Sequence, residues 1–177
     1  MVRIRYRDMP WVSNIVRPMR GVTLAGMDIR PATYADAEAG SLVLRRSIED
    51  LCHADHGGDP AAIAGWISNK TAAMWRIWVD QDASRLYVAV EAGRILGVGM
   101  IGPEGEIMLN YVSPDARLRG VSKALLGHME AEARASGVTR CRLESTKTAR
   151  RFYRAAGYVA HDGTSEGDHR MIKDLDR

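Results

Sequence analysis

The stretch between residues 106 and 135 constrains the fold more than any other part of the chain. Residues 106–112 are mostly apolar and are followed by Pro114, which predicts a strand that ends before the proline. Apolar side chains then recur every four residues, at Val121, Leu125, Met129 and Ala133. This spacing predicts a helix with one buried stripe. A basic segment, residues 117–120, therefore joins a strand to the first turn of a helix.

A glycine between basic residues at the start of a helix is typical of an anion site. Backbone N–H groups converge at a helix N-terminus, where the helix dipole favours negative charge. Gly120 permits close backbone approach because it has no Cβ, and positive charge is added by Arg117, Arg119 and Lys123. The spacing matches neither a P-loop nor a dinucleotide fingerprint. The segment predicts a phosphate-binding turn of another kind, with a solvated basic turn as the alternative when it is taken alone.

The remaining hydrophobic patterns predict alternating strands and helices. Strands are expected at residues 27–30, 86–91, 95–101, 106–112, 138–145, 158–160 and 170–173. Helices are expected at residues 37–56, where Gly57-Gly58 ends the first, at 60–79 with a break near 68–71, at 121–136 and at 149–156. The three consecutive strands that end at residue 112 have short connections and should form an antiparallel meander. This order predicts an α/β (α+β) fold, with a single mixed, mostly antiparallel sheet flanked by helices on both faces.

Composition excludes two classes of protein. No apolar run approaches the roughly 18 residues that a membrane helix needs, which excludes a membrane-spanning protein. Cys52 and Cys141 lie far apart and form no CxxC pair, so neither a disulfide framework nor a structural zinc site is indicated. The segment Cys52-His53-Ala54-Asp55-His56 contains metal-ligand types, but such tight spacing rarely lets three side chains converge. We expect a cytoplasmic protein without a metal.

Residues 1–26 differ in charge from the rest of the chain. They contain five arginines against a single aspartate, whereas the whole chain has a net charge of +3. Arginine-rich arms occur in nucleic-acid-binding proteins and in transit peptides. The arm by itself is a weak electrostatic footprint, and an orderly pattern starts at Met27. We expect a basic N-terminal extension at residues 1–26, a functional domain at residues 27–177, and no nucleic-acid partner.

Two motifs make the sequence similar to the GNAT superfamily of N-acetyltransferases. Val112-Ser113-Pro114 followed by Arg117-x-x-Gly-x-Ser122 resembles the family's acetyl-CoA-binding motif, in which Gln/Arg-x-x-Gly-x-Gly/Ala follows a strand. Ala149-x-x-Phe-Tyr-x-x-x-Gly-Tyr158 resembles the family's last helix. The resemblance covers about residues 27–175, and Ser122 is its one departure. It implies the GNAT acyl-CoA N-acyltransferase fold with acetyl-CoA as cosubstrate, and it makes a homodimer a reasonable expectation.

The resemblance also implies roles for individual residues. The strand ending at Val112 and the strand at residues 138–145 would splay apart, so that the pantetheine arm pairs with main-chain groups of Tyr111 and Val112. The pyrophosphate would be surrounded by Arg117, Arg119, Gly120, Val121, Ser122 and Lys123. The Val112 N–H would polarise the thioester carbonyl, in the manner of an oxyanion hole. Tyr153 would give a proton to the departing thiolate, although a tyrosine that shares a helix face with Phe152 also fits a core position.

The base and the acceptor follow from carboxylates near these motifs. Glu106 is the carboxylate nearest to the binding strand and is our candidate base. The alternative is loss of the amine proton through water to His128, Glu104 or bulk solvent. The resemblance implies that the segment at residues 52–56 lies at the mouth where the family binds its acceptor. With Glu49, Asp50 and Asp55 nearby, it would suit a cationic amine.

Three classes of function remain. We expect an acetyltransferase that moves an acetyl group directly from acetyl-CoA to a primary amine of a small molecule or peptide. A non-catalytic acyl-CoA-binding regulatory domain would keep the same cofactor seat, and a nucleic-acid-binding regulator would use residues 1–26. Three tryptophans of the second helical region fit either the core or a substrate pocket, namely Trp66, Trp75 and Trp78.

Overall fold

The computed structural model describes residues 26–81, 84–161 and 169–175, and the extension expected at residues 1–26 lies, but for Gly26, outside them. The strands are β1 Asp28–Pro31, β2 Arg85–Glu91, β3 Arg94–Ile101, β4 Ile107–Val112, β5 Arg140–Glu144, β6 Val159–Ala160 and β7 Arg170–Asp174. The helices are α1 Ala37–Leu51, α2 His53–His56, α3 Pro60–Ile67, α4 Ala72–Asp80, α5 Val121–Ala135 and α6 Arg150–Ala155. In these ranges no helix combines the length and the apolar character needed to cross a membrane.

Helix caps explain why the second helical region is broken. The Asp59 carboxylate accepts a hydrogen bond from the Ala61 N–H at 3.0 Å, and Pro60 takes the first position of α3. The Thr71 hydroxyl accepts a hydrogen bond from the Met74 N–H at 3.1 Å and starts α4. The break expected near residues 68–71 is therefore present.

Asp36 joins β1 to the start of α1. Its carboxylate accepts hydrogen bonds from the Arg30 guanidinium at 2.7 and 2.8 Å. It also accepts from the N–H and the hydroxyl of Thr33, both at 2.8 Å. The hydrogen bonds from Arg30, with those from Thr33, lower the pKa of Asp36 to about 2 against the effect of burial. The start of α1 is thus anchored to the first strand.

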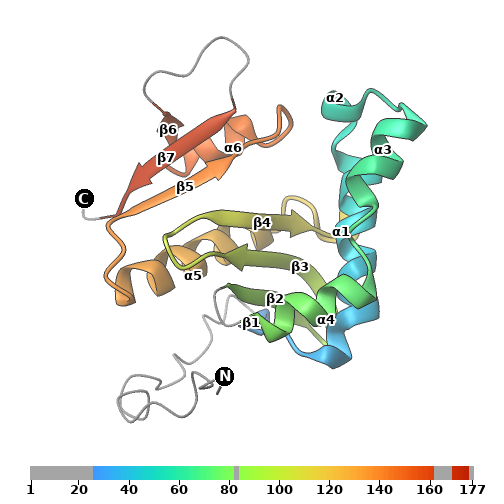
Figure 1. Ribbon diagram of the computed structural model, residues 1–177, viewed down its shortest axis with the longest axis horizontal. Helices are drawn as coiled ribbons and strands as arrows, with labels where there is room; N and C mark the ends of the chain where they lie inside the picture. Colours follow the sequence, from blue (N-terminus) through green and yellow to red (C-terminus); the bar gives the residue numbers. More distant parts are fainter. Residues whose placement is uncertain (1–25, 82–83, 162–168, 176–177) are drawn as a thin grey trace, which may run out of the picture.

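The sheet consists of two hydrogen-bonded parts, with strand orders β1-β2-β3-β4 and β5-β7-β6. All pairings within each part are antiparallel. The parts meet at an isolated parallel bridge between Glu106 and Arg142, where the Arg142 N–H donates to the Gly105 carbonyl at 3.0 Å. Beyond this contact β4 and β5 diverge (Figure 1). The mixed, mostly antiparallel sheet and the splayed strands are both as expected.

Helices cover both faces of the sheet (Figure 1). α5 packs on one face against Gly97 and Gly99 of β3, because a Cβ on Gly97 would lie 2.7 Å from the Val121 side chain. α1 and α4 pack on the other face around Trp75, which is fully buried and donates its indole N–H to the Thr33 carbonyl at 3.0 Å. Trp75 therefore belongs to the core.

Candidate active site

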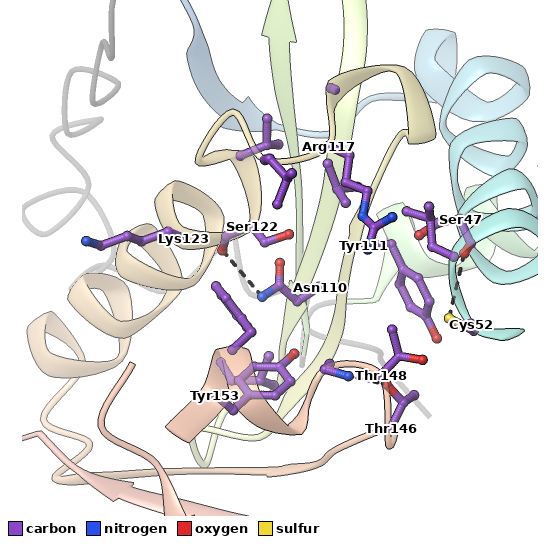
Figure 2. Close-up of a pocket in the computed structure, with 18 of the residues that line it drawn as sticks. Ser47, Cys52, Asn110, Tyr111, Arg117, Ser122, Lys123, Thr146, Thr148 and Tyr153 are labelled. Atoms are coloured by element: carbon purple, nitrogen blue, oxygen red, sulfur yellow. Dashed lines mark hydrogen bonds between the residues drawn. The ribbon is translucent and has the colours of Figure 1, made fainter. Parts of the chain in front are cut away.

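A cavity of about 440 Å³ lies where β4 and β5 diverge (Figure 2). β4, the turn before α5, the first turn of α5, the loop after β5 and α6 form most of its wall. The end of α1 contributes Ser47, Leu51 and Cys52. Since α1 packs on one face of the sheet and α5 on the other, residues from both faces line the cavity.

Most of the residues expected to bind the cofactor line this cavity together, namely Tyr111, Val112, Arg117, Gly120, Val121, Ser122 and Lys123. Arg119 does not. Its guanidinium donates to both carboxylate oxygens of Glu91, at 2.7 and 2.8 Å, and it lines a neighbouring hollow beside α5. Arg117 thus lines the cavity, whereas Arg119 is paired with Glu91 outside it.

The turn before α5 has the backbone of an anion site. Gly120 is the N-cap residue, has a φ of +81° and would place a Cβ in open space. No side chain caps the helix, so the N–H groups of its first turn remain available to a ligand. Leu118 also has a left-handed φ, +63°, and is 96% exposed, which costs conformational energy in a residue other than glycine. This arrangement, with Arg117 and Lys123 beside it, fits a pyrophosphate.

The register of β4 decides which of its main-chain groups face the cavity. The Ser113 N–H donates to the Leu96 carbonyl of β3 at 2.8 Å. Successive residues of a strand direct their N–H groups to opposite edges, so the main chain of Tyr111 faces β3. The N–H and C=O groups of Asn110 and Val112 therefore face the open edge toward β5. Val112 is placed as expected, whereas the second set of edge groups belongs to Asn110 rather than to Tyr111.

Asn110 is a cavity residue that the sequence analysis did not single out. Its side-chain amide donates to the Ser122 carbonyl at 3.4 Å, and within the described residues its buried Oδ1 has no partner. Figure 2 shows the side chain between Ser122 and Tyr153. A buried amide oxygen that lines a cavity and lacks a partner is suited to accept a hydrogen bond from a ligand N–H. A polar residue inside the apolar strand Ile107–Val112 was the available signal.

Tyr153 lines the cavity from α6 and is only 7% exposed. Burial raises the pKa of its hydroxyl to about 12, although a hydrogen bond from Asn110 opposes the shift. The phenol therefore carries its proton at neutral pH. Its ring also packs edge-on against Phe152 and Tyr158, with centroids 5.1 and 5.6 Å apart. Tyr153 is thus both a core aromatic and a proton-bearing group in the cavity.

The expected bases are not brought to the cavity. Glu106 lies where the two parts of the sheet meet, with its carboxylate 3.8 Å from Arg142 and its side chain 54% exposed. Glu104 pairs with the same arginine at 2.7 Å. His128 packs edge-on against Tyr87 at 4.6 Å on α5. None of these three side chains is part of the cavity wall.

Asp55 and His56, which follow α1, make structural hydrogen bonds and do not line the cavity. The Asp55 carboxylate accepts hydrogen bonds from the Lys147 N–H at 2.6 Å and from the Thr148 hydroxyl at 2.6 Å. His56 is buried, accepts the Gly58 N–H at Nδ1 and directs Nε2 to the Ile48 carbonyl, both at 3.0 Å. The segment expected at the acceptor mouth therefore holds the loop after β5.

The two remaining tryptophans lie outside the cavity wall. The Trp66 side chain hydrogen-bonds to Tyr111, and burial raises the pKa of that tyrosine to about 12. The Lys70 ammonium lies 5.8 Å from the ring centroid of Trp78. Trp66 and Trp78 therefore do not line the cavity, so neither forms the substrate pocket that was the alternative to a core position.

Residues 54–173 match the acetyltransferase (GNAT) domain family. The chain belongs to this family. Acetyl transfer is therefore its general activity, with acetyl-CoA as the cosubstrate, and the fit of the basic turn and the β4 edge to such a molecule agrees with this. Among curated protein sequences, none matches the chain significantly.

Solved structures show the same fold. PaiA N-acetyltransferase from Thermoplasma acidophilum, in complex with coenzyme A, is 20% identical with a TM-score of 0.73, over 84% of this chain and 98% of that one. A GCN5-related N-acetyltransferase from Rhodopseudomonas palustris is 23% identical with a TM-score of 0.74, over 86% of this chain and 98% of that one. N-acetylglutamate synthase from Neisseria gonorrhoeae, complexed with coenzyme A and L-arginine, is 20% identical with a TM-score of 0.60, over 87% of this chain and 34% of that one.

Proposed function

We propose that the chain transfers an acetyl group directly from acetyl-CoA to a primary amine of a small molecule or peptide. The observation that carries the proposal is one cavity that joins an uncapped α5 N-terminus, an open β4 edge and a buried, protonated tyrosine. A cavity lined from both faces of the sheet gives the two substrates separate approaches. A domain that only binds acyl-CoA would need the α5 N-terminus and the β4 edge, but not a buried tyrosine hydroxyl in the same cavity.

Acetyl-CoA supplies the acetyl thioester. The first-turn N–H groups of α5, with Arg117 and Lys123, are suited to hold its pyrophosphate. The main-chain groups of Asn110 and Val112 are suited to hold amides of the pantetheine arm, as one strand pairs with the next. In this way the open edge of β4, which β5 leaves unpaired, becomes the binding site of the pantetheine arm.

Two residues act on the reacting atoms of the thioester. The Val112 N–H stabilises negative charge on the carbonyl oxygen while the amine nitrogen bonds to the carbonyl carbon. The carbon–sulfur bond then breaks, and the Tyr153 hydroxyl gives its proton to the sulfur of coenzyme A. The amine loses its extra proton to water at the open mouth, because Glu106 lies outside the cavity wall.

Coenzyme A release with a panel of amines tests the proposal, together with calorimetric binding of acetyl-CoA. Tyr153→Phe should lower kcat by about a hundredfold and leave acetyl-CoA affinity unchanged, because only the proton donor is lost. Tyr158→Phe is the matched control, since Tyr158 is equally buried, touches Tyr153 and does not line the cavity. Acetyl-CoA binding without turnover of any amine would instead identify a non-catalytic acyl-CoA-binding domain.

The cytoplasmic location, the homodimer and the absence of a nucleic-acid partner stay predictions. Sedimentation of the purified chain measures its oligomeric state. A DNA titration over a salt series, with and without residues 1–26, measures whether the basic extension binds nucleic acid. Affinity that falls on deletion would favour the nucleic-acid-binding alternative.

A further inference from the structure

Glu144 is the last residue of β5, and among the described residues it is the one carboxylate in the cavity wall. The cationic wall residues, Arg117 and Lys123, belong to the turn and helix after β4. β5 runs parallel to β4 from the bridge between Glu106 and Arg142, so Glu144, two residues past Arg142, lies across the opening from Met108 near the start of β4. The cavity thus has positive charge on one side and a single negative charge on the other.

The direction of Glu144 follows from the alternation along β5. Cys141 and Leu143 are buried in the core that α5 and α6 share, including Tyr153. The side chain of Glu144, an exposed neighbour of Leu143, therefore projects to the other face of the sheet. The end of α1 lines the cavity on that face with Cys52. Glu144 and Tyr153 consequently line the cavity from opposite faces of the sheet.

The Glu144 carboxylate is also available to a ligand. Within the described ranges it makes no ion pair or hydrogen bond, and Arg170 is its cross-strand neighbour in β7. The carboxylates first expected to meet a cationic acceptor are engaged elsewhere or outside the wall. Asp55 holds the loop after β5, and Asp50 lies 3.9 Å from Arg46. Glu144 is the remaining carboxylate that an acceptor in the cavity can meet.

We propose that Glu144 determines acceptor specificity, by favouring amines that carry a second positive charge close to the reacting nitrogen. The inference rests on the proposed acetyl transfer. An exposed carboxylate about 4 to 6 Å from a ligand charge changes affinity by a factor of about three to five per unit charge. Tyr153 releases coenzyme A with its proton, and Glu144 selects which amine arrives.

A series of four-carbon amines with different tails tests the inference. 1,4-Diaminobutane has a cationic tail, butylamine a neutral one and 4-aminobutyrate an anionic one. In the wild type, kcat/KM should fall in that order, by about three- to fivefold per step. Glu144→Gln should make the three values nearly equal, and Glu144→Lys should reverse the order. The changes should lie in KM rather than in kcat, because Glu144 recognises charge without transferring the proton to sulfur.

Glu38→Lys is the matched control, because it changes the net charge equally at an exposed position at the start of α1, outside the cavity wall. It should keep the wild-type order. A Glu144→Lys enzyme that keeps the wild-type order, or a Glu38→Lys enzyme that reverses it, overturns the inference.

Binding separates this inference from the proposed function. Calorimetry of the same three amines with the coenzyme A-loaded chain should give the same order of affinity, reversed by Glu144→Lys. If no amine is acetylated, the proposed function fails, while the reversal in binding still supports the role of Glu144. If the wild type does not bind 1,4-diaminobutane more tightly than 4-aminobutyrate, the inference fails even where acetyl transfer is observed.

Discussion

The Asp55 carboxylate of α2 accepts hydrogen bonds from both the hydroxyl and the N–H of Thr148, at 2.6 and 3.3 Å. It thereby links a helix that follows α1 to the loop between β5 and α6. Beyond the bridge at Glu106, β4 and β5 are not hydrogen-bonded to each other, so other contacts must hold the end of β5 in place. The hydrogen bonds from Lys147 and Thr148 to Asp55 are such contacts.

Asp55→Ala should loosen the loop at residues 146–148. The change removes a charged acceptor from three hydrogen bonds, which at this exposed site corresponds to about 1 to 2 kcal/mol in the free energy of unfolding. Hydrogen exchange of the Lys147 and Thr148 amides should become faster, and KM for the amine should rise. Asp50→Ala, which removes a carboxylate 3.9 Å from Arg46, is the control. Equal exchange rates in the two variants would contradict the linking role.

Gly120→Leu should abolish acetyl-CoA binding while the chain stays folded. A side chain at this position meets no other residue, so it fills the space beside the α5 N-terminus that the phosphates need. Gly137→Leu is a close control, because Gly137 has a φ of +80° and equally open surroundings at the other end of α5. Both variants should lose about 1 kcal/mol of stability through backbone strain. Calorimetry should show that only Gly120→Leu loses acetyl-CoA binding. Unchanged affinity in that variant would count against a phosphate site at the α5 N-terminus.

Gly105→Ala should destabilise the contact between the two parts of the sheet. Gly105 has a φ of +81°, and an added Cβ would lie 2.6 Å from the Arg140 carbonyl oxygen, which belongs to the backbone and cannot turn away. We expect a loss of about 2 kcal/mol or more in urea unfolding. Gly93→Ala has a similar φ, +77°, and no neighbour within 4 Å, so it isolates the strain alone. Equal losses would show that the close approach is unimportant.

Asp36 makes stability depend on acid pH. Its folded pKa of about 2 lies below the ordinary value of 3.8, so the native state binds fewer protons than the unfolded state between these values. The stabilisation by Arg30 is therefore complete above this window and is lost as the pH falls through it. Tm measured from pH 7 to pH 2 should fall less steeply for Asp36→Asn than for the wild type. Asp50→Asn should retain the wild-type profile, and an Asp36→Asn profile as steep as the wild type's would contradict the prediction.

Local patterns predicted the elements because each pattern has a direct physical cause. The four-residue spacing after Val121 gave α5 its buried stripe, and the caps at Asp59 and Thr71 separated α3 from α4. The placement of Val112 and Tyr153 in one cavity followed from the family resemblance rather than from periodicity. Helices and strands that are determined by residues close in the sequence can thus be predicted from it.

Site details that depend on strand register and side-chain rotamer could not be predicted from local sequence patterns. Glu106 is close to the binding strand in sequence, but it lies at the end where the two parts of the sheet meet. Arg117 and Arg119 are equivalent in the sequence, and only the fold shows that Glu91 engages the second. The main-chain groups of Asn110 face the opening because Ser113 pairs with Leu96, a register that no local pattern specifies.

The fixed contact between Gly105 and Arg142 means that β4 and β5 separate progressively from one point. The width available to a group in the opening is then set by its distance from that point. A slender group can lie deep between the strands, whereas a branched one is stopped nearer the mouth. We expect size selection among acyl groups and acceptors to follow from this backbone geometry, and to persist through substitutions of the lining side chains as long as the contact at Gly105 is kept.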